Sequence, residues 1–144
     1  SEKNEIFDLS ELLNETIEKY ENIYITRNLS ENILINGRKN LLKRGFNNII
    51  DNALKYGKKI NVQLNRNGKN IFVLIEDNGP GIPKEEYENV FKPFYKIDKG
   101  RSETKSSVGL GLSIASDIVR SHGGYIKLGK SSMNGLGVKI FLPV

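Results

Sequence analysis

Apolar residues recur along the chain with two spacings, one typical of helices and one typical of strands. Helical spacing predicts three helices, over residues 8–20, 38–56 and 109–121. A shorter helix is predicted from Pro83 to about Val90, because proline is favoured in the first turn of a helix. Asp8 or Ser10 is expected to cap the first helix, and Gly57 follows the second.

Short alternating or continuous apolar stretches predict the strands. They cover residues 23–28, 33–35, 59–64, 70–76, 125–128 and 138–142. Turn residues join the third strand to the fourth and the fifth to the sixth, as in antiparallel hairpins. The order of elements predicts an α+β fold, a two-layer α/β sandwich whose mixed, mostly antiparallel sheet carries helices on one face. A single domain over residues 1–144 is expected.

Residues 94–108 are polar and show neither helical nor strand spacing. Loops of this length inside a compact domain are uncommon and are usually functional lids or disordered segments. The lysines, glycine and serines of this stretch suit a cover over a negatively charged ligand. We therefore predict a long lid here.

Composition narrows the possible classes of function. The chain has 144 residues, 38% of them hydrophobic and 27% charged, which suits a soluble globular protein. It has no cysteine and a single histidine, His122, which excludes disulfides, thiolate metal sites and multi-histidine sites. No apolar stretch is long enough to span a bilayer and no signal peptide is visible. Because the chain starts at Ser1 without methionine, we expect it to be part of a longer protein.

The formal net charge of +5 comes from lysines that are mostly scattered. Nucleic-acid binding would need a clustered basic stripe with aromatic or groove-reading residues, and none is visible. A basic domain instead favours acidic or phosphorylated partners.

Two polar patterns suggest a binding site. Asp77-Asn78-Gly79-Pro80-Gly81 directly follows a predicted buried strand, and binding sites of α/β proteins tend to lie where strands end. The alternative is a plain turn. On the long helix, Asn48, Asn52 and Lys55 fall nearly on one line, beside the apolar stripe. Amide oxygens suit Mg²⁺ and a lysine suits phosphate, although a solvated helix face would look the same.

Four motifs together resemble those of bacterial two-component sensor histidine kinases. Residues 48–56 (NIIDNALKY) resemble the N box, and residues 77–82 (DNGPGI) resemble the first glycine box. Residues 91–96 (FKPFYK) are similar to the F box, and residues 109–114 (GLGLSI) to the second glycine box. They occur in the family's order and spacing, and the resemblance covers essentially the whole chain. The chain is thus similar to the catalytic and ATP-binding domain of these kinases, which belongs to the superfamily shared with gyrase, a heat-shock chaperone and mismatch-repair ATPases.

The resemblance implies an ATP site with an adenine end and a phosphate end. Asp77 would accept a hydrogen bond from the adenine amine, and Tyr56 would lie near the base. Asn52 would bind Mg²⁺, and Asn48, Lys96 and Arg101 would act at the phosphates as catalytic residues. The implied ATP-binding set is Asn48, Asn52, Lys55, Tyr56, Asp77, Gly79, Gly81, Ile82, Phe91, Phe94, Tyr95, Lys96, Arg101, Gly109, Leu110, Gly111 and Leu112.

Within that set, the resemblance gives several residues a positioning role. Gly79 and Gly81 would let the backbone approach the base, and the backbone amides of residues 109–112 would face the phosphates. Phe91 and Phe94 would anchor the lid, with ordinary core packing as the alternative for both. Lys96 stands where arginine is frequent, which gives up bidentate phosphate contacts.

One position implies phosphoryl transfer and not efficient hydrolysis. Hydrolases of the superfamily carry a glutamate four residues before the Mg²⁺ asparagine, whereas this chain has Asn48, whose amide cannot take a proton at neutral pH. The acceptor would be a histidine in a dimerisation domain that precedes Ser1, and a response regulator would act downstream. His122 follows a helix and is interpreted as a capping or packing residue. The resemblance implies a cytoplasmic domain without direct membrane contact, within a protein of the bacterial inner membrane.

Two other functions remain open, an anti-sigma-type protein serine kinase and a degenerate, non-catalytic nucleotide-binding interaction module. A third pattern is a decoy: residues 124–131 (GYIKLGKS) satisfy the P-loop consensus letter for letter. Their alternation predicts a strand, and a turn and another strand follow where a P-loop would open a helix. We therefore expect no phosphate site there.

Overall fold

The three long predicted helices and all six predicted strands form in the computed structural model, which describes residues 1–21, 24–95 and 108–144. The helices are α1 (Leu9–Glu18), α2 (Lys39–Tyr56) and α3 (Val108–Ser121). The strands are β1 (Glu5–Asp8), β2 (Ile25–Leu29), β3 (Leu34–Gly37), β4 (Ile60–Asn67), β5 (Asn70–Asp77), β6 (Tyr125–Lys130) and β7 (Leu136–Pro143). Among these helices, none is both long and apolar enough to cross a lipid bilayer.

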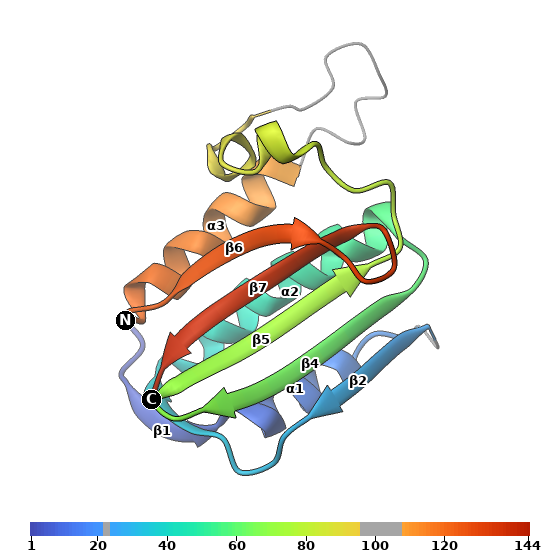
Figure 1. The fold of residues 1–144 in the computed structure, drawn as a ribbon. Helices are drawn as coiled ribbons and strands as arrows, with labels where there is room; N and C mark the ends of the chain where they lie inside the picture. The colour runs from blue at the N-terminus through green and yellow to red at the C-terminus, as the bar shows by residue number, and fades with distance from the viewer. Residues whose placement is uncertain (22–23, 96–107) are drawn as a thin grey trace.

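The main sheet has five strands in the order β2-β4-β5-β7-β6. Only the outer pair β2 and β4 is parallel, and the other three neighbouring pairs are antiparallel. All three helices lie on one face of this sheet, and no helix among the described residues covers the other, open face (Figure 1). A separate antiparallel ribbon joins β1 to β3. The predicted α+β two-layer sandwich with a mixed, mostly antiparallel sheet is confirmed.

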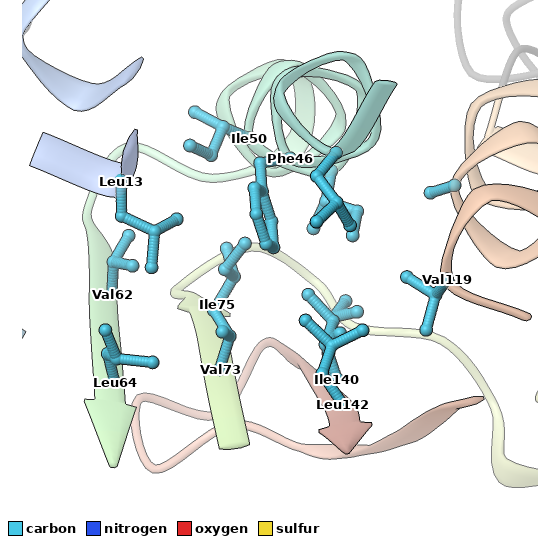
Figure 2. Close-up of a cluster of buried hydrophobic side chains, with 14 of the residues drawn as sticks. Leu13, Phe46, Ile50, Val62, Leu64, Val73, Ile75, Val119, Ile140 and Leu142 are labelled. Atoms are coloured by element: carbon cyan, nitrogen blue, oxygen red, sulfur yellow. The ribbon is translucent and has the colours of Figure 1, made fainter. Parts of the chain in front are cut away.

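The hydrophobic core lies between the sheet and the helices, and Figure 2 shows its centre. Phe46 of α2 points toward Ile75 of β5, and Ile50 of the same helix and Val73 of the same strand lie nearby; all four are at most 1% exposed. Every second residue of β5 faces this core because side chains alternate along a strand. Asp77 is the next position on that core-facing side, which places its carboxylate at the end of the strand beneath α2.

The segment after Pro83 differs from its prediction. In place of one helix to about Val90, it forms two short 3₁₀ helices, η1 (Lys84–Glu86) and η2 (Asn89–Phe91). Val90 is the one buried residue of these two turns, and Tyr87 and Phe91 pack against the core only partly buried, so the segment lacks a fully buried apolar stripe. A helix this short is not stable without such packing, because isolated helices need roughly 12 or more residues. The strand β1 was not predicted, since its four residues show no alternation of apolar and polar side chains.

His122 joins the end of α3 to the start of α2. Its Nε2 accepts a hydrogen bond from the Arg38 backbone N–H at 3.0 Å, and its Nδ1 lies 2.8 Å from the Ile118 carbonyl oxygen. A neutral ring protonated at Nδ1 satisfies both contacts. Arg38 adds two bonds from its Nη2, to the Ser121 carbonyl and hydroxyl oxygens, at 3.1 and 2.8 Å. The interpretation of His122 as a capping and packing residue is confirmed.

This junction should contribute measurably to stability. We expect His122→Ala to lower the free energy of unfolding by about 1–3 kcal/mol, because the half-buried Arg38 N–H loses its acceptor. Urea unfolding monitored by circular dichroism measures the change. Arg120→Ala, at an exposed position two residues earlier, is the matched control and should change stability by less than about 0.5 kcal/mol. Equal stability of the two variants would contradict the assignment.

Candidate functional site

The C-terminal ends of α2 and β5 meet, and the side chain of Asn78 ties them together. Asn78 Oδ1 accepts hydrogen bonds from the backbone N–H groups of Lys58 and Lys59, at 2.7 and 2.9 Å. The Asn78 backbone N–H donates to the Lys59 carbonyl oxygen at 3.2 Å. The chain leaving the helix is therefore joined to the chain leaving the strand.

Asp77 supplies a buried carboxylate at this junction. The residue is 4% exposed, and its Oδ1 accepts from the backbone N–H groups of Gly79 and Leu136, at 2.8 and 3.2 Å. Within the described ranges no group donates to its other oxygen, Oδ2. Burial raises the pKa of Asp77, and the two backbone hydrogen bonds partly oppose that rise. The carboxylate is thus held by one oxygen and keeps the other as an acceptor.

Three glycines let separate segments approach this carboxylate. A Cβ on Gly79 would lie 2.7 Å from the Tyr56 carbonyl oxygen. A Cβ on Gly135, in the turn between β6 and β7, would lie 2.3 Å from both the backbone oxygen and the Oδ1 of Asp77. Gly81 adopts a positive φ of 73° that L side chains rarely adopt. Backbone from three parts of the chain therefore surrounds Asp77 closely.

The polar face of α2 continues from this junction. The side chains of Asn48 and Asn52 are half-buried, and neither hydrogen-bonds to another residue that the structure describes. Lys55 is exposed, and its Nζ lies 5.8 Å from the ring centroid of Tyr56. Burial raises the pKa of Tyr56 to about 12, so this phenol stays neutral at physiological pH. The apolar stripe beside this polar line faces the core, as predicted.

The first turn of α3 lies beside the middle of α2. A Cβ on Gly111 would be 3.8 Å from the Asn48 carbonyl oxygen, and a Cβ on Gly45 would be 3.4 Å from Ile118 Cγ2. Small residues on both helices thus permit a close approach. Leu112 is fully buried, so its side chain belongs to the core. The backbone of residues 109–112 consequently begins a helix next to Asn48.

The predicted lid residues are only partly within the described chain. Ile82 and Phe91 are half-buried and pack against the core. Phe94 is 74% exposed with a φ of 62°, so the alternative interpretation of Phe94 as a core residue is wrong. Tyr95 donates from its hydroxyl to Glu86 Oε2 at 2.5 Å. Lys96 and Arg101 lie outside the described residues, and their roles stay predictions.

Sequence reasoning missed several residues that shape the site. Asn78 was quoted only as part of a motif, although asparagine commonly bonds backbone groups near turns. Gly135 and Leu136 were placed in a hairpin with no role at Asp77, because no local pattern indicates a contact across 59 residues of chain. The strand, turn and strand predicted for the decoy pattern are confirmed: residues 125–130 form β6, and a turn and β7 follow it.

Comparisons with known proteins identify relatives of this chain. Residues 37–144 match the family model described as histidine kinase-, DNA gyrase B-, and HSP90-like ATPase. The chain is 36% identical over 109 residues to the sensor histidine kinase CpxA of Escherichia coli K12, an alignment covering 75% of this chain and 24% of CpxA. It is 41% identical over 108 residues to the histidine-protein kinase ArlS of Staphylococcus aureus USA300, covering 73% of this chain and 24% of ArlS. It therefore spans about a quarter of these relatives.

Solved structures agree with the sequence relatives. The mycobacterial sensor histidine kinase MprB superposes with a TM-score of 0.82 at 26% identity, covering 97% of each chain. The histidine kinase domain of the E. coli osmosensor EnvZ gives a TM-score of 0.76 at 32% identity, covering 100% of this chain and 91% of that one.

The close approach at Gly135 leads to a test with a control in the same hairpin. We expect Gly135→Ala to lower the free energy of unfolding by about 1–3 kcal/mol, because its Cβ would overlap backbone and carboxylate atoms of Asp77. Gly129→Ala introduces a Cβ with no atom within 4 Å and should be neutral or stabilising by less than about 1 kcal/mol. Denaturant unfolding measures both. Similar effects of the two substitutions would contradict the described packing.

Proposed function

Because the chain belongs to the histidine kinase-, DNA gyrase B- and HSP90-like ATPase family, as the ATPase domain of a sensor histidine kinase, we propose that it binds Mg-ATP and donates the γ-phosphate to a histidine of a dimerisation domain. We further propose that residues 1–144 are one domain of a longer kinase, which acts on the cytoplasmic side of a membrane and passes the phosphoryl group to a response regulator.

The observation that carries the proposal is the buried carboxylate of Asp77 with one oxygen left as an acceptor. Adenine presents an amine donor, which matches Oδ2 of Asp77. Guanine presents a carbonyl oxygen at the same ring position, which would leave two acceptors facing each other in a buried site. Such a mismatch is expensive, so the site should prefer ATP to GTP. Gly79 and Gly81 would let the backbone approach the base, and the neutral Tyr56, whose backbone lies close to Gly79, would lie near it.

The phosphate end would be formed by α2, the start of α3 and the lid. The half-buried amides of Asn48 and Asn52, which have no partner among the described residues, fit an Mg²⁺ site of this kind. Asn52 would hold the ion, which when bound neutralises charge on the phosphates and takes further ligands from them and from water. Lys55 and the backbone amides of residues 109–112 would bind phosphate oxygens, and Lys96 and Arg101 would reach the γ-phosphate from the lid.

The reaction is transfer to a nitrogen nucleophile. An imidazole nitrogen of the acceptor histidine forms a bond to the γ-phosphorus while the bond from phosphorus to the β–γ bridging oxygen breaks, which releases ADP. Asn48 has no basic atom at neutral pH, so it can orient a group but cannot deprotonate water. The domain would therefore protect ATP from hydrolysis until a histidine is presented.

Nucleotide binding should depend on Asp77 and not on the decoy lysine. We expect Asp77→Asn to weaken adenine-nucleotide binding at least about tenfold, since the amide presents a donor to the adenine amine and loses the charge. Lys130→Ala should leave the affinity nearly unchanged, because Lys130 is an exposed residue at the end of β6 and is not among the proposed ATP-binding residues. Isothermal titration with an ATP analogue measures both, and the reverse order would refute the assignment.

Transfer can be tested by mixing this domain with Mg-ATP and a separate histidine-bearing dimerisation domain of a sensor kinase. We expect an acid-labile phosphohistidine on that domain, and loss of most of it in Asn52→Ala because Mg²⁺ is no longer held. Nucleotide binding without any phosphohistidine would contradict the proposal. Phosphoserine on a protein partner would instead indicate a serine kinase, and binding that is indifferent to Mg²⁺ would indicate a non-catalytic module.

A further inference from the structure

Two consecutive carboxylates at the end of β5 bind the same turn from opposite faces of the sheet. Asp77 lies on the face covered by helices, and Glu76 lies on the open face because side chains alternate along a strand. The turn of residues 131–135 joins β6 to β7 and curls over the end of β5 (Figure 1). Asp77 accepts from the N–H of Leu136, the first residue after the turn, and Glu76 contacts the turn itself through Ser132.

Glu76 is buried although it lies on the open face. It is 6% exposed, and its Oε2 and Oε1 accept hydrogen bonds from the Ser132 backbone N–H at 2.8 Å and the Ser132 hydroxyl at 3.0 Å. No lysine, arginine or histidine in the described part of the chain forms an ion pair with it. Burying a carboxylate without a cation costs free energy, which these two charge-assisted bonds partly offset. A neutral polar side chain at this position would fill the same space without the cost of burying a charge.

The turn transmits this contact to Asp77 because its own hydrogen bonds make it stiff. The Ser131 N–H donates to the Gly135 carbonyl oxygen at 2.9 Å, and the Asn134 N–H donates to the Ser131 carbonyl oxygen at 3.0 Å. The Ser131 hydroxyl oxygen accepts from the Met133 N–H at 2.9 Å. Glu76 thus holds one end of the turn through Ser132, and the other end positions the Leu136 N–H against Asp77.

We propose that Glu76 is a positioning residue of the nucleotide site, which through Ser132 keeps Gly135 and Leu136 against Asp77 so that one oxygen of that carboxylate faces the base. The consequence for nucleotide rests on the function proposed above, whereas the positioning of Asp77 does not.

Release of the turn would change Asp77 in a defined way. Its Oδ1 would lose one of two amide donors, and the carboxylate would be free to rotate. Only the hydrogen bond from Gly79 would then oppose the effect of burial, and the pKa of Asp77 would rise further. Neighbouring titratable groups should not obscure the titration of Asp77. Tyr56 is neutral, and Lys58 and Lys59 take part in the junction through their backbone N–H groups, which donate to Asn78.

The experiment compares Glu76→Ala, which removes both acceptors, with Glu76→Gln, which keeps one amide oxygen to accept from the Ser132 N–H. Asn61→Ala is the matched control, because Asn61 lies directly opposite Glu76 on β4, its side chain accepts a hydrogen bond from Thr26, and it forms no hydrogen bond with the turn among the described residues. Two readouts need no nucleotide: hydrogen exchange of the Leu136 amide, and NMR titration of the Asp77 carboxyl. The third is affinity for an ATP analogue as a function of pH.

In Glu76→Ala we expect faster exchange at Leu136, a titration of Asp77 at higher pH, and about tenfold weaker binding at neutral pH. Because the ionised carboxylate is the better acceptor, affinity falls as pH drops through the pKa of Asp77, and this fall should begin at higher pH in the variant. Glu76→Gln should restore most of each property, and Asn61→Ala should resemble the original chain.

The outcomes separate the two proposals. Unchanged exchange at Leu136 and unchanged titration of Asp77 in Glu76→Ala would overturn the role of Glu76, whatever the nucleotide result. Changes in both without any binding of nucleotide by the original chain would support the positioning role and refute the proposed function. If Glu76→Ala does not fold, Ser132→Ala removes the hydroxyl bond alone and must show the same shifts at smaller amplitude; its failure to do so would equally overturn the role.

Discussion

The burial of one carboxylate, that of Asp77, is the constraint around which the site is arranged. A carboxylate that is 4% exposed must be hydrogen-bonded or it will take up a proton, and here two backbone N–H groups from distant parts of the chain supply the bonds. They can reach it only because Gly79 and Gly135 carry no side chains where backbone and carboxylate crowd together. The ends of β5 and α2 and the turn between β6 and β7 are therefore held together around one buried charge that must be hydrogen-bonded.

The helix α2 connects this constraint to the rest of the fold. Its apolar side places Phe46 and Ile50 in the centre of the core, and its other side carries Asn48 and Asn52 toward the site. Because both sets lie on one rigid element, the spacing of the two amides relative to Asp77 is set by core packing and by the Asn78 bonds at the helix end. Because Gly111 has no side chain toward the Asn48 carbonyl oxygen, the start of α3 lies close beside the same helix. Stability and site geometry consequently draw on the same packing.

Much of this could be predicted from the sequence because the signals are local. The apolar spacing of α2, the alternation of β5 and the residues 77–81 at its end are each read within a few positions, and all appear where they were expected. The segment after Pro83 was misjudged since a favourable first residue does not replace an apolar stripe. The contacts of Glu76 with Ser132 and of Asp77 with Leu136 join residues 56 and 59 positions apart, so only the folded topology brings them together. Strand pairing beyond the hairpins, such as the parallel pair of β2 and β4, is non-local in the same way.

The two ends of the proposed site differ in what determines them. The adenine end consists of backbone groups and one carboxylate within the described part of the chain, so its geometry is built into the fold and is available before any ligand arrives. The phosphate end offers two amides on a helix and the first turn of another helix, and its remaining cations belong to residues 96 and 101. Such a division suits the proposed transfer to a histidine of another domain. The rigid end would select the nucleotide, while the reacting end, which has no base at Asn48, would depend on the histidine presented to it.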